Sequence, residues 1–313
     1  MQQTYSRRSR RKKFPTHIIV FLAPATIIYT LFMIYPLFDS MRLSFFSADS
    51  QGQEFFVGLQ NYITLFTDEL WQPRLWGAFK HNVIFFIIHM IVQNSIGLLL
   101  AALLTMRITR GAGFFRTIFF LPTMLSVVIV GFIWELILSP LWGVAETIMG
   151  WFGLADLYQP WLGLEGPALI ALSFISVWQF IGIPMMLFYA ALIGIPEELI
   201  EAATVDGASA WKTFWKIKFP LILPTVGIVA VLTYVGNFNA FDLIYTTQGA
   251  LAGPNFSTDI MGTFFYRTFF GQQLQLGNPT MGATVATVMF MIILVGVLAY
   301  LFLWQRRIQN YEL

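Results

Sequence analysis

The chain has 313 residues, of which 57% are hydrophobic and only 11% are charged, whereas a soluble globular domain carries about 25% charged residues. A single core of this size could not bury that much apolar surface, so the composition excludes a soluble enzyme and a disordered chain. The absence of cysteine excludes disulfides and thiol chemistry, and the three histidines make a histidine-rich metal site unexpected, so we predict no metal site.

Six segments each hold about 20 largely apolar residues, enough to cross a hydrocarbon layer of roughly 30 Å as a helix. They are residues 18–37, 83–105, 117–138, 168–193, 221–244 and 281–303. The fifth is the least regular, because Asn237, Asn239 and Asp242 interrupt its end. The sequence therefore predicts an all-α, polytopic membrane protein. Its six-helix domain spans residues 18–304, between a basic tail at 1–17 and a short tail at 305–313.

Lysine and arginine predict the orientation of these helices. Fourteen of the 18 lie in the two tails and in the loops after the second and fourth segments, and four lie on the other side. The fourteen are Arg7, Arg8, Arg10, Arg11, Lys12, Lys13, Arg107, Arg110, Arg116, Lys212, Lys216, Lys218, Arg306 and Arg307. Because basic residues concentrate in cytoplasmic loops, both termini are expected in the cytoplasm.

The cytoplasmic segment at residues 196–224 carries the signals of two short helices. Pro196 fits the first turn of a helix that runs to Ala203, and Gly207 can end it in a left-handed conformation. Ser209 can cap a second helix over residues 210–217, which Pro220 would end. Such a pair could dock into a groove on a soluble partner, or it could be an ordinary amphipathic connector at the membrane surface.

This segment resembles the EAA loop of permease subunits in binding-protein-dependent ABC importers. The family pattern is Glu-Ala-Ala, three residues, Gly, nine residues, and Ile-x-Leu-Pro. The corresponding residues are Glu201-Ala202-Ala203, Gly207 and Ile217-Lys218-Phe219-Pro220. The spacing is kept, and Phe219 replaces the usual leucine.

Further fragments are similar to the sugar permeases of the maltose and glycerol-phosphate type. They are Tyr35-Pro36, Gly58-Leu59-Gln60-Asn61-Tyr62, Phe115-Arg116, Leu121-Pro122, Trp178, Ile195-Pro196-Glu197-Glu198, Asp206-Gly207-Ala208 and Phe241-Asp242. The chain departs from the family after the fifth span. Thr-x-Gly-Gly-Pro is usual there, whereas residues 246–254 read Thr-Thr-Gln-Gly-Ala-Leu-Ala-Gly-Pro. We therefore expect a remodelled outer loop and an altered contact with the binding protein.

The resemblance implies half of the translocation pore of an ATP-driven sugar importer in a bacterial or archaeal inner membrane. The implied partners are a second homologous permease subunit, a cytoplasmic ABC ATPase dimer, an extracytoplasmic sugar-binding protein and the lipid bilayer, with no nucleic acid. The chain has no Gly-x-x-x-x-Gly-Lys-Ser/Thr loop, so ATP and Mg would be bound by the ATPase, and we expect no cofactor here. The implied coupling residues are Glu201, Ala202, Ala203, Asp206, Gly207, Ile217 and Pro220. Without the motif, Glu201 would be read as a solvated helix charge.

Polar residues inside the spans are candidates for the substrate path, because they are costly in a bilayer and usually face a cavity. Thr233 and Asn237 are four residues apart and share a helix face, with Tyr234 close to it. The resemblance adds Trp178 and Gly182, and Glu135 is an isolated carboxylate. Hydroxyl, amide and aromatic groups suit a neutral sugar. The alternative is that these groups only bond one helix to another.

Two other functions compete with this interpretation. A secondary transporter driven by an ion gradient usually needs buried carboxylates, and only Glu135 and the marginal Asp39 and Asp242 are available. A membrane enzyme needs a catalytic constellation, and the sequence contains neither a His-Glu-x-x-His motif nor a convincing acid pair. Neither function explains the cytoplasmic segment as well, so we expect a transporter subunit that is not an enzyme.

Overall fold

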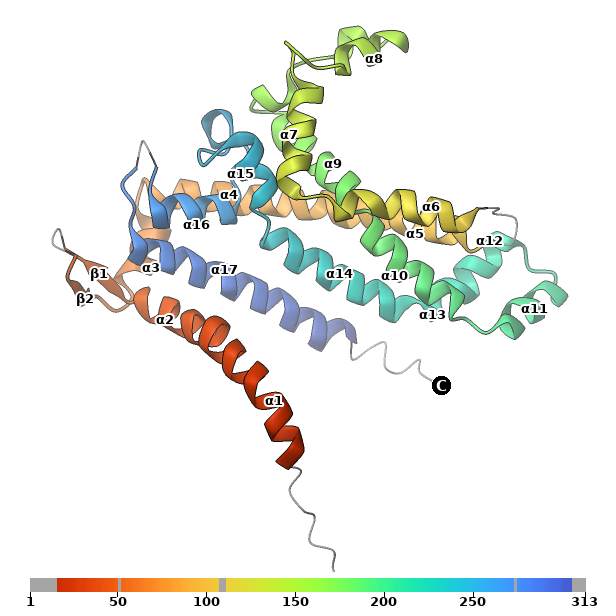
Figure 1. Cartoon of the computed structure of the whole chain (residues 1–313), viewed down its shortest axis with the longest axis horizontal. Coiled ribbons are helices and arrows are strands. Elements are labelled where there is room, and N and C mark those ends of the chain that lie inside the picture. Colours follow the sequence, from red (N-terminus) through yellow and green to blue (C-terminus); the bar gives the residue numbers. More distant parts are fainter. Residues whose placement is uncertain (1–15, 50–51, 107–110, 273–274, 306–313) are drawn as a thin grey trace, which may run out of the picture.

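A computed structural model describes residues 16–49, 52–106, 111–272 and 275–305 of the chain (Figure 1). The basic residues of both tails, together with Arg107 and Arg110, lie outside these ranges. The described residues are mostly helical, and strands β1 (Phe46–Ala48) and β2 (Glu54–Phe56) pair in one antiparallel hairpin. The prediction of an all-helical membrane protein is confirmed.

Four helical stretches in the described residues could each cross a bilayer without a sharp bend: Val20–Leu43, Trp71–Leu104, Leu223–Gln248 and Pro279–Gln305. The first joins α1 (Thr16–Tyr29), the π-helical turn η1 (Thr30–Ile34) and α2 (Tyr35–Leu43). The second joins α4 (Trp71–Ile88), η2 (His89–Gln93) and α5 (Asn94–Leu104). The third contains α14 (Leu223–Phe238) and α15 (Asp242–Gln248), and the fourth contains α17 (Pro279–Ala299) and η8 (Tyr300–Gln305). These stretches begin and end several residues away from the predicted boundaries.

The expected third and fourth spans are not single helices. The third divides into α6 (Ala112–Phe120), the 3₁₀ turn η3 (Leu121–Met124) and α7 (Val127–Leu138), and its two halves meet at 96°. The fourth divides at Ile181 into α9 (Ala168–Phe180) and α10 (Gly182–Ile193). The sequence predicts one apolar span over each of 117–138 and 168–193, with Gly182 and Pro184 as the place where the fourth can bend, and the structure breaks the fourth next to these residues. The break in the third span was not predicted.

At the two breaks, a side chain of each span donates a hydrogen bond to a backbone carbonyl oxygen of the other span. Pro122 and Pro184 lack a backbone N–H and cannot continue a regular helical ladder. The side chain of Gln179 donates to the carbonyl oxygen of Leu125 at 3.1 Å, and the hydroxyl of Thr123 donates to the carbonyl oxygen of Gln179 at 2.8 Å. In a bilayer, irregular backbone is tolerated only where such groups are paired within the protein.

Helix α14 packs closely against α17 and its continuation η8 at two glycines, Gly296 and Gly227. The hydroxyl of Tyr234 on α14 donates to the carbonyl oxygen of Ile292 at 2.7 Å, and its ring occupies the space that a Cβ of Gly296 would need. Tyr300 in η8 lies in the same way against Gly227 of α14. Small residues of this kind let membrane helices approach closely.

The segment between the fifth and sixth spans contains a helix that the sequence pattern did not predict, α16 (Met261–Phe270). Arg267 of this helix is buried and pairs with Asp259 through two hydrogen bonds, of 2.6 and 3.2 Å. The guanidinium also donates to the carbonyl oxygen of Ala250 at 3.0 Å and lies over the ring of Phe256. Arg267, which we had counted as an outer-loop cation, therefore fixes the loop at residues 249–260 against α16.

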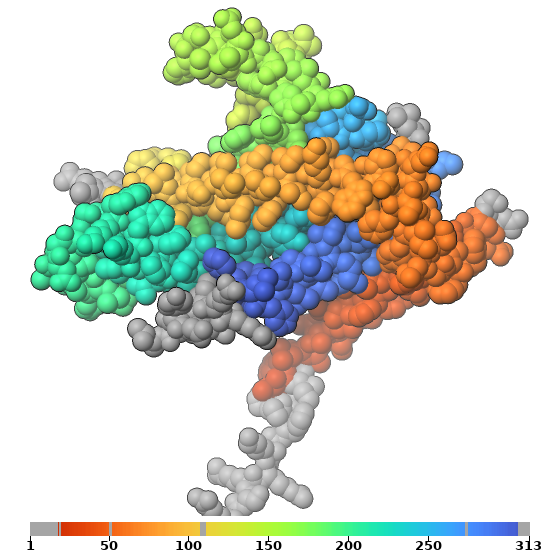
Figure 2. All heavy atoms as spheres, turned by 180° about the vertical axis from the view of Figure 1, so that it is seen from behind, coloured from red at the N-terminus to blue at the C-terminus, as the bar shows by residue number. Residues whose placement is uncertain are grey.

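Two parts of the chain extend away from the bundle of α4, α5, α10, α14 and α17. In Figure 1, α1 runs away below it, while α7 and α8 (Ala145–Trp151) rise above it. In the most apolar part of the first span, no residue is buried against the rest of the chain. Figure 2 shows α4 and α5 as a continuous ridge across the opposite face, with the segment near residue 200 protruding at one end.

Candidate functional site

The predicted coupling segment lies at one end of the bundle, opposite the β1–β2 hairpin (Figure 1). Its first helix is α11 (Glu197–Val205), which meets α10 at 71°. Pro196 precedes the helix as its cap residue, one position earlier than predicted. Glu197 and Glu198 occupy the first turn, where the positive end of the helix dipole favours carboxylates.

The EAA residues present one exposed face and one packed face of α11. Glu201, Ala202 and Asp206 are exposed, whereas Ala203 is buried. Gly207 has a φ of +73°, as the predicted left-handed stop requires, and nothing lies within 4 Å of a Cβ built on it. The short side chain of Ala202 leaves the backbone open to close approach beside the Glu201 carboxylate.

The second helix begins as predicted but does not end at Pro220. The hydroxyl of Ser209 accepts from the N–H of Lys212 at 3.3 Å and caps α12 (Ala210–Thr213). The chain then continues through a π-helical stretch, η6 (Phe214–Lys218), into α13 (Phe219–Leu221). Ile217 is partly buried and Pro220 is exposed. Pro220 stands in the first turn of α13, where its missing N–H breaks no bond.

Thr233 and Asn237 share a face of α14, but that face is packed on the second span. The side chain of Asn94 bonds the hydroxyl of Thr233 at 3.1 Å, and that of Asn82 donates to the carbonyl oxygen of Asn237 at 2.8 Å. Asn237 itself donates to the carbonyl oxygen of Thr233 at 2.7 Å. Both residues are buried. In this structure these groups bond one helix to another, which is the alternative that the sequence left open, and their place in a substrate path stays a prediction.

The remaining candidates for the substrate path are also dispersed. Tyr234 packs on α17, and Gly182 lies under the backbone of Phe119 and Phe120. Trp178 is 43% exposed and meets the ring of Trp134 on α7 edge to face, with centroids 5.5 Å apart. Glu135, next to that tryptophan, is exposed on α7. Only Trp178 and Glu135 are left on a free surface of this chain.

A buried row of polar side chains on the second span escaped the sequence analysis. Asn82, His89 and Gln93 are all buried, and the ring of His89 bonds the hydroxyl of Ser176 at 2.9 Å. Their spacing of seven and four residues places them on one helix face, which is the signal that could have revealed them. Within the described residues, the amide oxygens of Gln93, Gln179 and Asn237 are buried without a hydrogen-bond partner.

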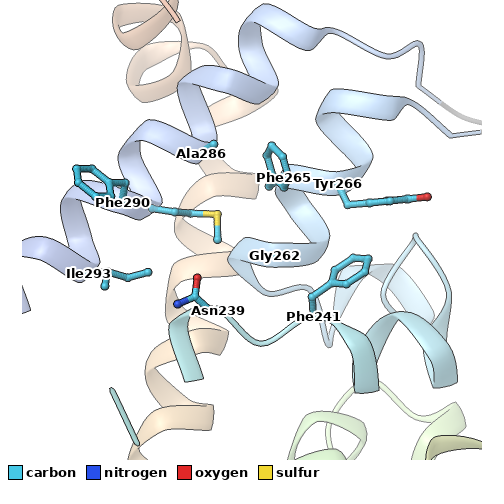
Figure 3. Close-up of a pocket in the computed structure, with 9 residues that line it drawn as sticks. Asn239, Phe241, Gly262, Phe265, Tyr266, Ala286, Phe290 and Ile293 are labelled. Carbon is cyan, nitrogen blue, oxygen red and sulfur yellow. The ribbon is translucent and has the colours of Figure 1, made fainter. Parts of the chain in front are cut away.

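A pocket with a volume of about 530 Å³ lies on another side of α14 (Figure 3). The end of α14, helix α16 and helix α17 form its walls. Its lining residues are Asn239, Phe241, Gly262, Phe265, Tyr266, Ala286, Met289, Phe290 and Ile293. Figure 3 shows the amide of Asn239 directed into an otherwise apolar and aromatic space.

The described residues contain no group of three or more histidine, aspartate or glutamate side chains that could hold a metal ion. Residues 93–309 match the family of the binding-protein-dependent transport system inner membrane component, and the chain belongs to this family. It is a multi-pass permease subunit of an ABC importer, and its family is one of transporter components, not of enzymes.

The chain resembles its relatives over nearly its whole length. It is 33% identical to a probable ABC transporter permease protein, YurN, of Bacillus subtilis, over 86% of this chain and 90% of that one. It is 30% identical to AmyD of Thermoanaerobacterium thermosulfurigenes, a probable starch degradation products transport system permease protein, over 92% and 94%. A crystal structure of a bacterial ABC transporter involved in alginate import matches with a TM-score of 0.78 at 22% identity, over 95% and 96%. That structure supports the fold.

Proposed function

We propose that this permease subunit imports a neutral sugar or oligosaccharide and is driven by a cytoplasmic ABC ATPase that binds ATP and Mg. The observation that carries the proposal is the exposed face of α11, with Glu201 and Ala202 beside the left-handed Gly207. A short amphipathic helix of this kind fits a groove on a soluble partner. Because α11 is joined to α10 at one end and through α12 to α14 at the other, movement of the helix would be passed to both spans.

A second homologous permease subunit is the partner we propose within the membrane. The first span is unburied in this chain, and α7 and α8 extend away from the bundle with several exposed apolar side chains, including Trp142 and Trp151. A pair of such subunits would give the ATPase dimer two docking segments. In this arrangement both termini lie in the cytoplasm, and the outer end, with α16 and the β1–β2 hairpin, faces the sugar-binding protein.

The sugar class rests on two observations. The relative AmyD is named for starch degradation products, and the pocket of Figure 3 offers four aromatic rings and one amide. Aromatic faces cover the apolar face of a pyranose, and an amide bonds its hydroxyl groups. Asn237 remains a second proposal, because its buried Oδ1 is unpaired and could accept from a sugar hydroxyl once the helices separate.

The coupling proposal is tested with the complete importer, purified with the subunits that accompany this chain. We expect Glu201→Lys to abolish most of the ATP hydrolysis that the loaded binding protein stimulates. Glu69→Lys, the same charge change at an exposed position just before α4, should leave stimulation intact. Full stimulation in Glu201→Lys would remove α11 from the coupling role.

The sugar proposal is tested by uptake of labelled malto-oligosaccharide into vesicles, with assembly measured in parallel. Phe241→Ala should lower uptake about tenfold, because loss of one buried contact costs on the order of 1–3 kcal/mol. Phe270→Ala removes an exposed ring of α16 outside the pocket and serves as the control. Equal uptake in the two variants would exclude the pocket from the sugar path.

A further inference from the structure

The second cytoplasmic helix presents two adjacent rows of side chains that the coupling role does not use. We call this surface the cytoplasmic foot and define it as Trp211, Lys212, Trp215 and Lys216, all exposed. The indole rings of Trp211 and Trp215 meet edge to face with centroids 5.6 Å apart. Trp215 in turn contacts the ring of Phe219 at 5.0 Å. The aromatic row therefore runs along the helix with a lysine row beside it.

The opposite face of the same helix is packed against the bundle. Thr213 is buried, and Phe214 and Phe219 join the apolar cluster formed by the cytoplasmic ends of α5 and α10, including Leu104 and Leu192. The helix is thereby held with the foot turned outward. The exposed fractions of Trp211 and Trp215 are 73% and 43%, so two of the largest apolar side chains of this end are uncovered within the chain.

The lysines of the foot have no acidic partner among the described residues. In this part of the chain Arg42 and Arg267 form ion pairs with carboxylates, whereas Lys212 and Lys216 form none. Lys218, one turn further on, is also without an ion pair in the same ranges and adds to the positive charge. An uncompensated basic row favours an anionic surface.

The position of the foot indicates which anionic surface lies beside it. The helix continues through α13 directly into α14, which begins at Leu223 and is part of a membrane span. The foot is thus held within a few residues of the cytoplasmic edge of the hydrocarbon layer. Tryptophan rings are enriched at this depth, and lysines beside it attract the negatively charged lipids of the inner leaflet.

We propose that the cytoplasmic foot binds the headgroups of anionic phospholipids, with the rings of Trp211 and Trp215 inserted at the interface and Lys212 and Lys216 on the phosphates. The exposed acidic face of α11 remains directed to the aqueous side. The foot thus fixes the depth of the coupling segment relative to the membrane. The proposal rests on the membrane spans and holds whichever solute is carried.

The test uses the full-length chain, with its co-purified subunits, in nanodiscs of equal amounts of phosphatidylglycerol and phosphatidylcholine. Bromine, which quenches tryptophan fluorescence on contact, is attached to the acyl chains of either the phosphatidylglycerol or the phosphatidylcholine. The foot's signal is the difference between wild type and a Trp211→Phe, Trp215→Phe variant, since the chain has 10 tryptophans. We expect brominated phosphatidylglycerol to quench this signal at least about twofold more strongly than brominated phosphatidylcholine.

Matched variants distinguish an effect of the lysine charge from an effect of altered structure. Lys212→Gln with Lys216→Gln should bring the two quenching values together, while Lys212→Arg with Lys216→Arg should keep them apart. Lys80→Gln, which removes a lysine near the other end of the second span, should change nothing. Equal quenching by the two lipids in wild type would overturn the proposal. A foot signal that neither brominated lipid quenches would also overturn it and would assign the surface to the ATPase.

Discussion

Gly182 lies where the fourth span approaches the backbone of the third closely. A Cβ at this position would lie 2.8 Å from the carbonyl oxygen of Phe119 and from the Cα of Phe120. Both contacts are with backbone, which cannot turn aside as a side chain can. We therefore expect Gly182→Ala to lower stability by about 1–3 kcal/mol. Thermal unfolding of the purified chain measures this effect.

The control for this prediction is Gly236→Ala in α14, where nothing lies within 4 Å of a built Cβ. That substitution should leave the unfolding temperature unchanged or raise it slightly, since alanine favours helix. If the two variants unfold at the same temperature, the close approach at Gly182 does not constrain the fold.

The Arg267–Asp259 pair is the second prediction at this scale. The two side chains are 1% and 4% exposed, so removing one partner leaves a buried charge. We expect Arg267→Met to cost about 3–5 kcal/mol of stability. Arg42→Met breaks the Arg42–Asp39 pair, which is about half exposed and screened by solvent, and should change stability far less. A double variant, Arg267→Met with Asp259→Leu, should recover part of the loss, and failure to do so would contradict the assignment.

Single residues also mark where sequence analysis succeeded. Gly207 and Ser209 were predicted as a helix stop and a helix cap, because each role depends on one residue type acting on its own backbone. Thr233 and Asn237 were predicted to share a face, which they do, but not to meet Asn94 and Asn82. The partner across a helix interface depends on tertiary packing, which periodicity does not contain.

At the scale of elements, the breaks in the third and fourth spans depend on one side chain. Gln179 on α9 donates to the carbonyl oxygen of Leu125 between η3 and α7. We expect Gln179→Leu to leave that carbonyl unpaired and to cost about 1–3 kcal/mol. Thermal unfolding, together with protease sensitivity near residue 125, gives the measurement.

Gln179→Glu keeps the size of the side chain but removes its N–H donor, and it should be at least as destabilising as the leucine variant. Thr123→Val tests the reciprocal bond to the carbonyl oxygen of Gln179. If all three variants are as stable as wild type, the paired breaks are held by packing alone.

Hydrophobic length predicted where the membrane helices lie, and Gly182 with Pro184 indicated the bend of the fourth span, but the break of the third was not predicted. Each unbroken span contains an apolar run long enough to cross a bilayer, and this run is visible in the sequence and forms a helix in the structure. Pro122 and Pro184 were visible, yet a proline can kink a helix slightly or turn it by 96°, as between α6 and α7. Helix α16 was missed because its surroundings are rich in Gly, Asn and Thr, and the Arg267–Asp259 pair that supports it joins residues eight apart.

At the scale of the whole molecule, helices connect the end that carries α16 and the β1–β2 hairpin with the end that carries α11. The outer loop is fixed to α16 by Arg267, and Asn82 of the second span bonds both the N–H of Met261 and the end of α14. At the other end, α10, α11, α12 and α14 follow one another in the chain. A movement of α11 would therefore reach the outer end through α14 and Asn82.

The central claim is that ATP hydrolysis by a partner drives uptake through this subunit by way of α11. The most direct measurement is uptake of labelled malto-oligosaccharide into proteoliposomes that contain the purified importer and its loaded binding protein. Uptake is compared with ATP, and with an imposed proton or sodium gradient in its absence. We predict uptake only with ATP, and its loss in Glu201→Lys while the complex remains assembled. Uptake that follows the ion gradient without ATP would contradict the account.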